Sequence, residues 1–316
     1  MRICWIPLAT SALLWIGPSI SVCQSITEFE IPTPNCLPFS IVTGPDNALW
    51  FTEWGGNKIG RFMGGQGFTE FPLPSPSSAP IWMKVGPDAA LWFTEQNGNR
   101  IGRITTDGQI TEFPLPTPQS RPWNIAVGPD GALWFTEKGT LKIGRITTDG
   151  VLTEYGIRVS PWDLTSGPDG ALWITARSSN RILRMTVSGV VTNQYVSPTP
   201  NSGPDVITVG PDLALWFTEQ FAAKIGRVTV DGAWTEFDVP TPASQPGGIA
   251  VGSDGALWFV EHAGDKVGRI TVDGQVSEYP LQNPGSNPMV IEPGPDGALW
   301  FTEFYGNKIA RITTGS

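Results

Sequence analysis

Short apolar stretches recur along the whole chain, separated by turns rich in Gly, Pro and Asp. The stretch "ALWFTE" at Ala48–Glu53 returns unchanged at four further places, and looser copies read "ALWITA" (Ala171–Ala176) and "ALWFVE" (Ala256–Glu261). The Trp residues of the seven copies lie 39 to 43 residues apart. A period of this length with several short strands per unit is typical of a β-propeller. No helical periodicity follows residue 23, so we expect an all-β fold.

The unit around Trp134 shows the expected make-up of one blade. The turn sequences "GPDG" (Gly128–Gly131) and "DG" (Asp149 and Gly150) interrupt its apolar runs. Asp-Gly supplies the positive φ angles that a tight hairpin needs. The runs between the turns predict four antiparallel strands, at Arg121–Val127, Ala132–Glu137, Lys142–Thr148 and Val151–Tyr155.

The two ends of the chain complement each other. Ile26–Pro34 ("ITEFEIPTP") copies a fourth strand without a blade before it, and the last unit stops after its third strand, at Lys308–Ser316. The first strand is therefore predicted to complete the last blade, which removes an exposed sheet edge. The sequence predicts one domain over residues 24–316: a seven-bladed β-propeller with four antiparallel strands per blade, closed by its N-terminal strand.

Residues 1–23 have the pattern of a secretory signal peptide, because Arg2 is the only charge and an apolar run extends to Val22. We expect cleavage before Gln24, hence a secreted or periplasmic monomer without a membrane span. A lipid-modified Cys23 is the alternative. The net charge of −9 and the lack of a basic patch argue against nucleic acid as a partner.

Strand order divides the turns between two faces. In propellers, the blade-to-blade links and the starts of the innermost strands surround one mouth of the central channel, where ligand sites form. The Glu that ends "ALWFTE" occurs in six of seven copies and is followed by Lys or Arg, as in Glu53–Lys58. We predict a structural ion pair across that hairpin. Chemistry is expected instead from mouth residues that differ between the copies.

Polar residues stand near the starts of three successive innermost strands: Asn124, Asp163 and Asp205. Mg²⁺ and Ca²⁺ prefer oxygen ligands of this kind. The sequence therefore predicts a possible site for Mg²⁺ or Ca²⁺ there, with strand capping or binding of channel water as the alternative. Calcium-dependent lactonase propellers use a similar mix of ligands, so lactone hydrolysis is a competing function by analogy.

Aromatic residues gather at the same mouth: Trp82, Trp123 and Trp162, with Trp54 and Tyr305 in neighbouring loops. They are expected either to stack on a ring of a small-molecule or peptide ligand or to plug the channel as core.

Two further mouth residues depart from the repeat. Arg177 follows Ala176, where the other copies carry Glu, and is expected to form an ion pair with Asp163 or to hold a ligand carboxylate. His262 is the only histidine; it is a candidate base, with simple solvation as the alternative.

The repeated "LWFTE…NKIGRITTDG…ITEFPLPTP" closely resembles the streptogramin B lyases, also known as virginiamycin B lyases, from Ile26 to Thr314. The resemblance implies a seven-bladed propeller that linearises a cyclic depsipeptide antibiotic by elimination across its ester C–O bond, using a divalent metal, usually Mg²⁺. It also implies two catalytic His residues directly after Pro in the last two blades, and an acid before the last of these Pro residues.

This chain departs from that signature. Gly247 and Met289 stand where the family has His, and Asn287 stands where it has the acid. Glu303 is the remaining candidate from the family's catalytic group, and together with His262 it makes the two catalytic candidates of this chain. We therefore expect a ligand-binding propeller without the family's His-based catalysis. The alternatives are a Mg²⁺-dependent C–O lyase acting on streptogramin B depsipeptides and a metal-dependent lactonase.

Overall fold

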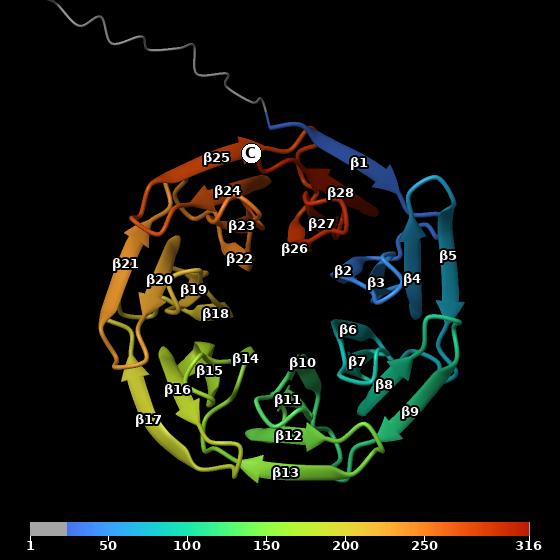
Figure 1. Cartoon of the computed structure of the whole chain (residues 1–316), viewed down its shortest axis with the longest axis horizontal. Helices are drawn as coiled ribbons and strands as arrows, with labels where there is room; N and C mark the ends of the chain where they lie inside the picture. The colour runs from blue at the N-terminus through green and yellow to red at the C-terminus, as the bar shows by residue number, and fades with distance from the viewer. Residues whose placement is uncertain (1–23, 316) are drawn as a thin grey trace, which may run out of the picture.

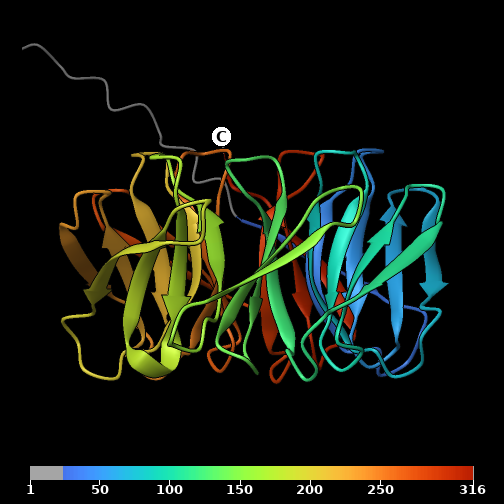
Figure 2. The ribbon, with the colours of Figure 1, turned by 90° about the horizontal axis from the view of Figure 1, so that it is seen from below.

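The computed structural model describes residues 24–315, which form seven four-stranded antiparallel sheets arranged as blades around a central channel (Figure 1). The all-β, seven-bladed prediction is confirmed. Figure 2 shows the ring from the side, with the turns at two opposite faces. The predicted signal peptide, residues 1–23, lies outside the described residues. No helix in the described range is long and apolar enough to span a membrane.

Each blade runs from an innermost to an outermost strand. The innermost strands are β2 (Pro38–Thr43), β6 (Pro80–Val85), β10 (Pro122–Val127), β14 (Leu164–Ser166), β18 (Pro204–Val209), β22 (Pro246–Val251) and β26 (Pro288–Pro293). The second strands are β3 (Leu49–Glu53), β7 (Leu91–Glu95), β11 (Leu133–Glu137), β15 (Leu172–Ala176), β19 (Leu215–Glu219), β23 (Leu257–Glu261) and β27 (Leu299–Glu303).

The outer half of each blade carries the third and fourth strands. The third strands are β4 (Lys58–Met63), β8 (Arg100–Ile104), β12 (Lys142–Ile146), β16 (Arg181–Met185), β20 (Lys224–Val228), β24 (Lys266–Ile270) and β28 (Lys308–Ile312). The outermost strands are β5 (Gly67–Pro72), β9 (Ile110–Pro114), β13 (Leu152–Gly156), β17 (Val191–Val196), β21 (Trp234–Asp238), β25 (Val276–Pro280) and β1 (Ile26–Glu30). A short 3₁₀ helix, η1 (Arg177–Ser179), follows β15.

The N-terminal strand closes the ring, as predicted. β1 pairs with β28 over five residues, from Ile26 opposite Ile312 to Glu30 opposite Lys308. Phe29 of β1 stacks on Trp300 of the last blade, with ring centroids 5.3 Å apart. The first and last blades are therefore joined by backbone pairing (Figure 1). The aromatic contact of Phe29 with Trp300 adds to this pairing.

A buried Trp with an Asp and an Arg explains most of the repeat. In the third blade the Trp134 indole donates to Asp130 at 2.9 Å, and Arg145 donates to the other oxygen of that carboxylate at 2.7 Å. The same three-residue arrangement recurs in all seven blades. "GPD", "LW" and "GR" are thus one structural unit, because the buried indole N–H needs an acceptor and the carboxylate needs a cation.

The Thr of "ALWFTE" links neighbouring blades. Thr52 accepts the N–H of Ser40 within its own blade and donates to the Ile81 carbonyl of the next blade, at 2.6 Å. At the closing seam, Thr302 donates to the Phe39 carbonyl at 2.6 Å. These hydroxyls hydrogen-bond to the first residues of the innermost strands and so hold the backbone at the mouth of the channel in place.

Candidate functional site

A cavity of about 270 Å³ lies at the mouth of the channel, where the innermost strands begin. We call it the mouth cavity. Its wall is mixed: aromatic and apolar side chains come from the innermost strands, and polar ones come mainly from the loops after the second strands. The lining residues are Phe39, Trp82, Trp123, Trp162, Arg177, Asp205, Val206, Gln220, His262, Met289 and Val290.

The three predicted Trp residues all line the mouth cavity. Phe39 meets Trp123 edge to face at 5.5 Å, and Trp123 meets Trp162 at 5.0 Å between ring centroids. Trp82 is almost fully buried, whereas Trp123 and Trp162 are half-buried. Trp82 therefore packs as core, while Trp123 and Trp162 keep accessible ring surface, and their stacking on a ligand stays a prediction.

Lys138 sits against these rings and was missed from the sequence. Its ammonium lies 3.4 Å from the ring centroids of both Trp123 and Trp162, a cation–π arrangement. Burial lowers the pKa of Lys138 to about 7, although the Asp205 carboxylate opposes the shift. The Lys138 amine, which is only partly protonated at pH 7, is thus packed on aromatic faces at the mouth.

Arg177 pairs with Asp205, not with Asp163 as predicted. Arg177 Nη1 lies 4.0 Å from Asp205 Oδ1, and the guanidinium stacks 4.3 Å from the Trp162 ring centroid. Asp205 is the first residue after its Pro, whereas Asp163 is the second and so lies deeper in the channel. Burial raises the pKa of Asp205 to about 6 against the opposing effect of Arg177.

A chain of hydrogen bonds orients His262. Arg177 donates to Gln220 Oε1, and Gln220 Nε2 lies 3.1 Å from His262 Nδ1. Because a guanidinium can only donate, the amide oxygen must face Arg177, and the amide NH₂ then donates to Nδ1. Burial lowers the pKa of His262 to about 4, so the ring is neutral at pH 7 and carries its proton on Nε2. His262 is therefore neither fully solvated nor arranged as a base at Nε2.

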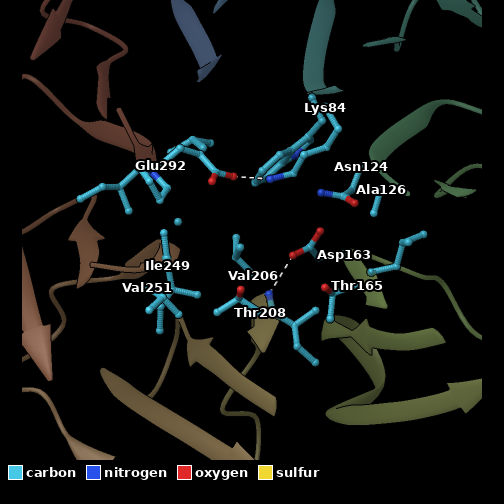
Figure 3. Close-up of a pocket in the computed structure, with 18 residues that line it drawn as sticks. Lys84, Asn124, Ala126, Asp163, Thr165, Val206, Thr208, Ile249, Val251 and Glu292 are labelled. Carbon is cyan, nitrogen blue, oxygen red and sulfur yellow. Dashed lines mark hydrogen bonds and ion pairs between the residues drawn. The ribbon is translucent and has the colours of Figure 1, made fainter. Parts of the chain in front are cut away.

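A second cavity, of about 240 Å³, lies further along the channel towards the opposite face, and we call it the channel cavity. It contains Asn124 and Asp163, but not Asp205 (Figure 3). Asp163 Oδ2 accepts the N–H of Ile207 at 2.7 Å. The three residues proposed from the sequence as one metal site are thus divided between two cavities.

The remaining predicted residues lie elsewhere. Tyr305 is 68% exposed and packs edge-on against Phe304 outside the mouth cavity. Glu303 is fully buried at the end of β27, and burial raises its pKa to about 7. The predicted ion pair between the repeated Glu and the following cation is wrong. Lys308 instead pairs with Glu28 of β1 at 2.6 Å, because its side chain turns outward across the sheet.

The sequence did contain a signal for the missed residues Lys138 and Gln220. The residue directly after the repeated strand differs in nearly every blade, although the sequence of the strand itself barely changes. These residues are Trp54, Gln96, Lys138, Arg177, Gln220, His262 and Phe304. Variation at one position of a rigid repeat marks the surface that is specific to this chain.

Comparison with known proteins bears on this geometry. A scan against protein families matches the Virginiamycin B lyase family over residues 16–160 and 156–316. The chain belongs to this family. A search of curated proteins found no significant match.

Solved lyase structures share the whole ring. The virginiamycin B lyase of Staphylococcus aureus is 39% identical over 92% of this chain and 100% of that chain, with a TM-score of 0.88. A streptogramin B lyase structure is 37% identical over 92% and 97%, with a TM-score of 0.87. A catalytically inactive His-to-Ala variant of the Staphylococcus aureus enzyme, solved with quinupristin, is 38% identical over 92% and 100%, with a TM-score of 0.88.

The lyase resemblance implies a catalytic His at position 247, whereas the histidine of this chain stands at position 262. A Cβ atom built at Gly247, where the resemblance places one catalytic His, would lie 1.8 Å from His262 Nε2. The imidazole of His262, which comes from the next loop of the same blade, therefore fills the space of the expected side chain. Gly247 is required because any larger residue would collide with that ring.

The residues at the positions of the family's catalytic signature do not fit the divalent metal that the lyase resemblance implies. Met289 offers a thioether, which is a poor ligand for Mg²⁺. The Asn287 amide donates to the His262 carbonyl at 3.2 Å. Within residues 24–315, no three His, Cys, Asp or Glu side chains gather in a group that could hold a metal ion.

Proposed function

We propose that the protein binds a ligand whose aromatic ring and carbonyl or carboxylate oxygens enter the mouth cavity, without using His262 as a base. The decisive observation is the Arg177–Gln220–His262 chain, which leaves His262 with an N–H at Nε2. A base that starts an elimination needs a free lone pair aimed at the proton it removes. The arrangement favours donation of a hydrogen bond over abstraction of a proton.

The chemistry of the cavity supports this ligand class. Trp123 and Trp162 offer ring faces, and the His262 ring lines the same cavity, with Gln220 at Nδ1 and a backbone contact to Met289. Arg177 and Lys138 add positive charge at the same wall. A ligand with an aromatic ring and oxygen acceptors would satisfy these donors and cover the rings. Cyclic depsipeptides of the streptogramin B class have this chemistry.

Family membership favours a second candidate. The solved lyases that resemble this chain at 37 to 39% identity include one solved with quinupristin. Elimination across the ester of a streptogramin B by a rearranged group of residues is therefore the alternative to simple binding. A lactonase-like hydrolysis has less support, because its expected ligands Asn124, Asp163 and Asp205 lie in two cavities.

Quinupristin is the test ligand, and calorimetry and mass spectrometry are the measurements. We expect the purified protein to bind quinupristin and to leave it cyclic, with or without Mg²⁺. Trp162→Ala should weaken binding by about tenfold or more, since a buried aromatic contact typically carries at least about 2 kcal/mol. Tyr305→Ala is the matched control, because Tyr305 lies outside the cavity, and its affinity should stay within about twofold.

A linear product would overturn the binding proposal. If its formation stopped in His262→Ala, His262 would act as the base and the lyase alternative would hold. If wild-type protein neither bound nor linearised quinupristin, the streptogramin class would be excluded as the ligand.

A further inference from the structure

The channel cavity has buried polar groups without partners. Asn124 Oδ1 and Asp163 Oδ1 have no hydrogen-bond partner among the described residues, and the two side chains are only 3% and 2% exposed. Both project into the cavity from neighbouring blades (Figure 3). Buried acceptors in native proteins nearly always have a partner, so this pair indicates a donor that arrives from outside the chain.

The charges in the channel cavity show what kind of donor is missing. Lys84 of β6 and Glu292 of β26 form an ion pair across the channel and so balance each other (Figure 3). No cation is bonded to Asp163; its carboxylate accepts hydrogen bonds only from backbone N–H groups, those of Ile207 and Leu164, among the described residues. Burial raises the pKa of Asp163 to about 8, so the carboxyl of the empty cavity is mostly protonated at pH 7, and a bound cation would favour its ionised form, whose charge nothing else in the cavity compensates. A ligand with a single positive charge and several N–H donors would neutralise it.

The opposite wall is apolar. Ile249 and Val251 line the side of the cavity that faces away from Asp163 and Asn124 (Figure 3). Thr208 adds a hydroxyl group at the rim between the two walls. A ligand that fills the cavity needs a short alkyl part beside its charged group.

We propose that the channel cavity binds a small primary amine, with its ammonium between Asp163 and Asn124 and its alkyl part against the apolar wall. A hydroxyl on the ligand would reach Thr208. The donor set favours an ammonium over a divalent metal ion. Only one free carboxylate is present, and the Lys84 ammonium lies in the same cavity. Mg²⁺ and Ca²⁺ require more oxygen ligands and more negative charge.

This site is separate from the mouth cavity. Trp82, Val206 and Val290 line both cavities and form the partition between them. Asp163 belongs to one cavity and Asp205 to the other. The amine proposal therefore does not depend on the proposed function, and either can fail without the other.

The test compares two ligands that differ in one group. Alaninol carries an ammonium where 1,2-propanediol carries a hydroxyl, and the rest of the two molecules is the same. We expect calorimetry with wild-type protein at pH 7 to show alaninol binding at least about tenfold tighter than 1,2-propanediol, since hydrogen bonds to charged groups are the strong ones. Any binding of Mg²⁺ or Ca²⁺ should be the same in wild-type protein and in Asp163→Asn.

Two matched variants locate the binding. Asp163→Asn keeps an acceptor for the Ile207 N–H but removes the charge, and should weaken alaninol binding by about tenfold or more. Asp205→Asn makes the same change in the mouth cavity and should leave it within about twofold. Equal binding of the two ligands by wild-type protein, loss of binding in Asp205→Asn instead, or a preference for divalent metal would each overturn the proposal. The wild-type comparison decides the matter even if Asp163→Asn fails to fold.

Discussion

At the scale of single residues, the histidine of this chain stands at position 262, whereas the lyase resemblance implies one at position 247. The imidazole of His262 occupies the space above Gly247, and Gln220 holds its Nδ1. His262 is therefore arranged to donate a hydrogen bond, whereas the catalytic His implied by the resemblance accepts a proton. A histidine held through Nδ1 by an amide N–H is a donor at Nε2, whatever its distance from a substrate.

The packing of His262 on Gly247 predicts a mutual dependence. Gly247→Ala places a methyl group 1.8 Å from Nε2, and overpacking of this kind costs about 1–3 kcal/mol of unfolding free energy. In the double variant Gly247→Ala/His262→Ala the collision disappears, so the loss caused by Gly247→Ala should largely vanish. Urea denaturation of the four proteins in the cycle measures this coupling.

Gly156→Ala is the control for the loss of Gly flexibility, because a Cβ at that position meets no atom within 4 Å. Equal destabilisation by Gly247→Ala with and without His262 would show that the ring does not occupy this space.

At the scale of elements, the Glu at the end of the second strand is a buried acid repeated around the ring. Burial raises the pKa of Glu53 to about 8 and that of Glu95, Glu219, Glu261 and Glu303 to about 7. These values exceed the ordinary pKa near 4.5, so the folded state holds more protons than the unfolded chain between pH 4.5 and 7 or 8. The contribution of these Glu residues to the free energy of unfolding is therefore fully present below pH 4.5 and is lost as the pH rises through this window.

Glu95→Gln tests this linkage. The free energy of unfolding of the wild type should fall with rising pH between 4.5 and 7, although His262, whose pKa is lowered, opposes the trend as one group. Removing Glu95 should reduce the slope by about 1.4 kcal/mol per pH unit. Chemical denaturation at several pH values gives the slope. Glu30→Gln, on the exposed end of β1, should leave it unchanged; a slope that Glu95→Gln does not alter would contradict the assignment.

The elements show why sequence predicted the fold better than the site. Strand number and closure follow from a repeat in which every blade makes the same local contacts, so seven copies and two complementary ends sufficed. Site contacts depend on depth along the channel. Asp163 is the second residue after its Pro and Asp205 is the first. Because of this offset of one position, Asp163 lines the channel cavity while Asp205 lies beside Arg177. The sequence shows the offset but not which loop side chain reaches each depth.

At the scale of the whole molecule, the ring depends on one non-covalent seam. β1 supplies the outermost strand of the last blade, and Glu28 of β1 forms an ion pair with Lys308 of β28. Phe29 packs between Phe62 and Trp300, with ring centroids 5.0 Å and 5.3 Å away. Cys36 is buried and is the one free cysteine of the described part, which leaves packing and hydrogen bonds to hold the seam.

Removing residues 1–30 should therefore open the last blade. The edge of β28 would expose unpaired backbone groups, which favour pairing with another chain. We expect the melting temperature to fall by about 5 °C or more, because a buried Phe side chain and a strand of backbone pairs are lost together. Light scattering after gel filtration should show self-association. A chain that begins at Ser25 keeps β1 and is the control; a monomeric 31–316 chain with unchanged melting temperature would show that the first strand is dispensable.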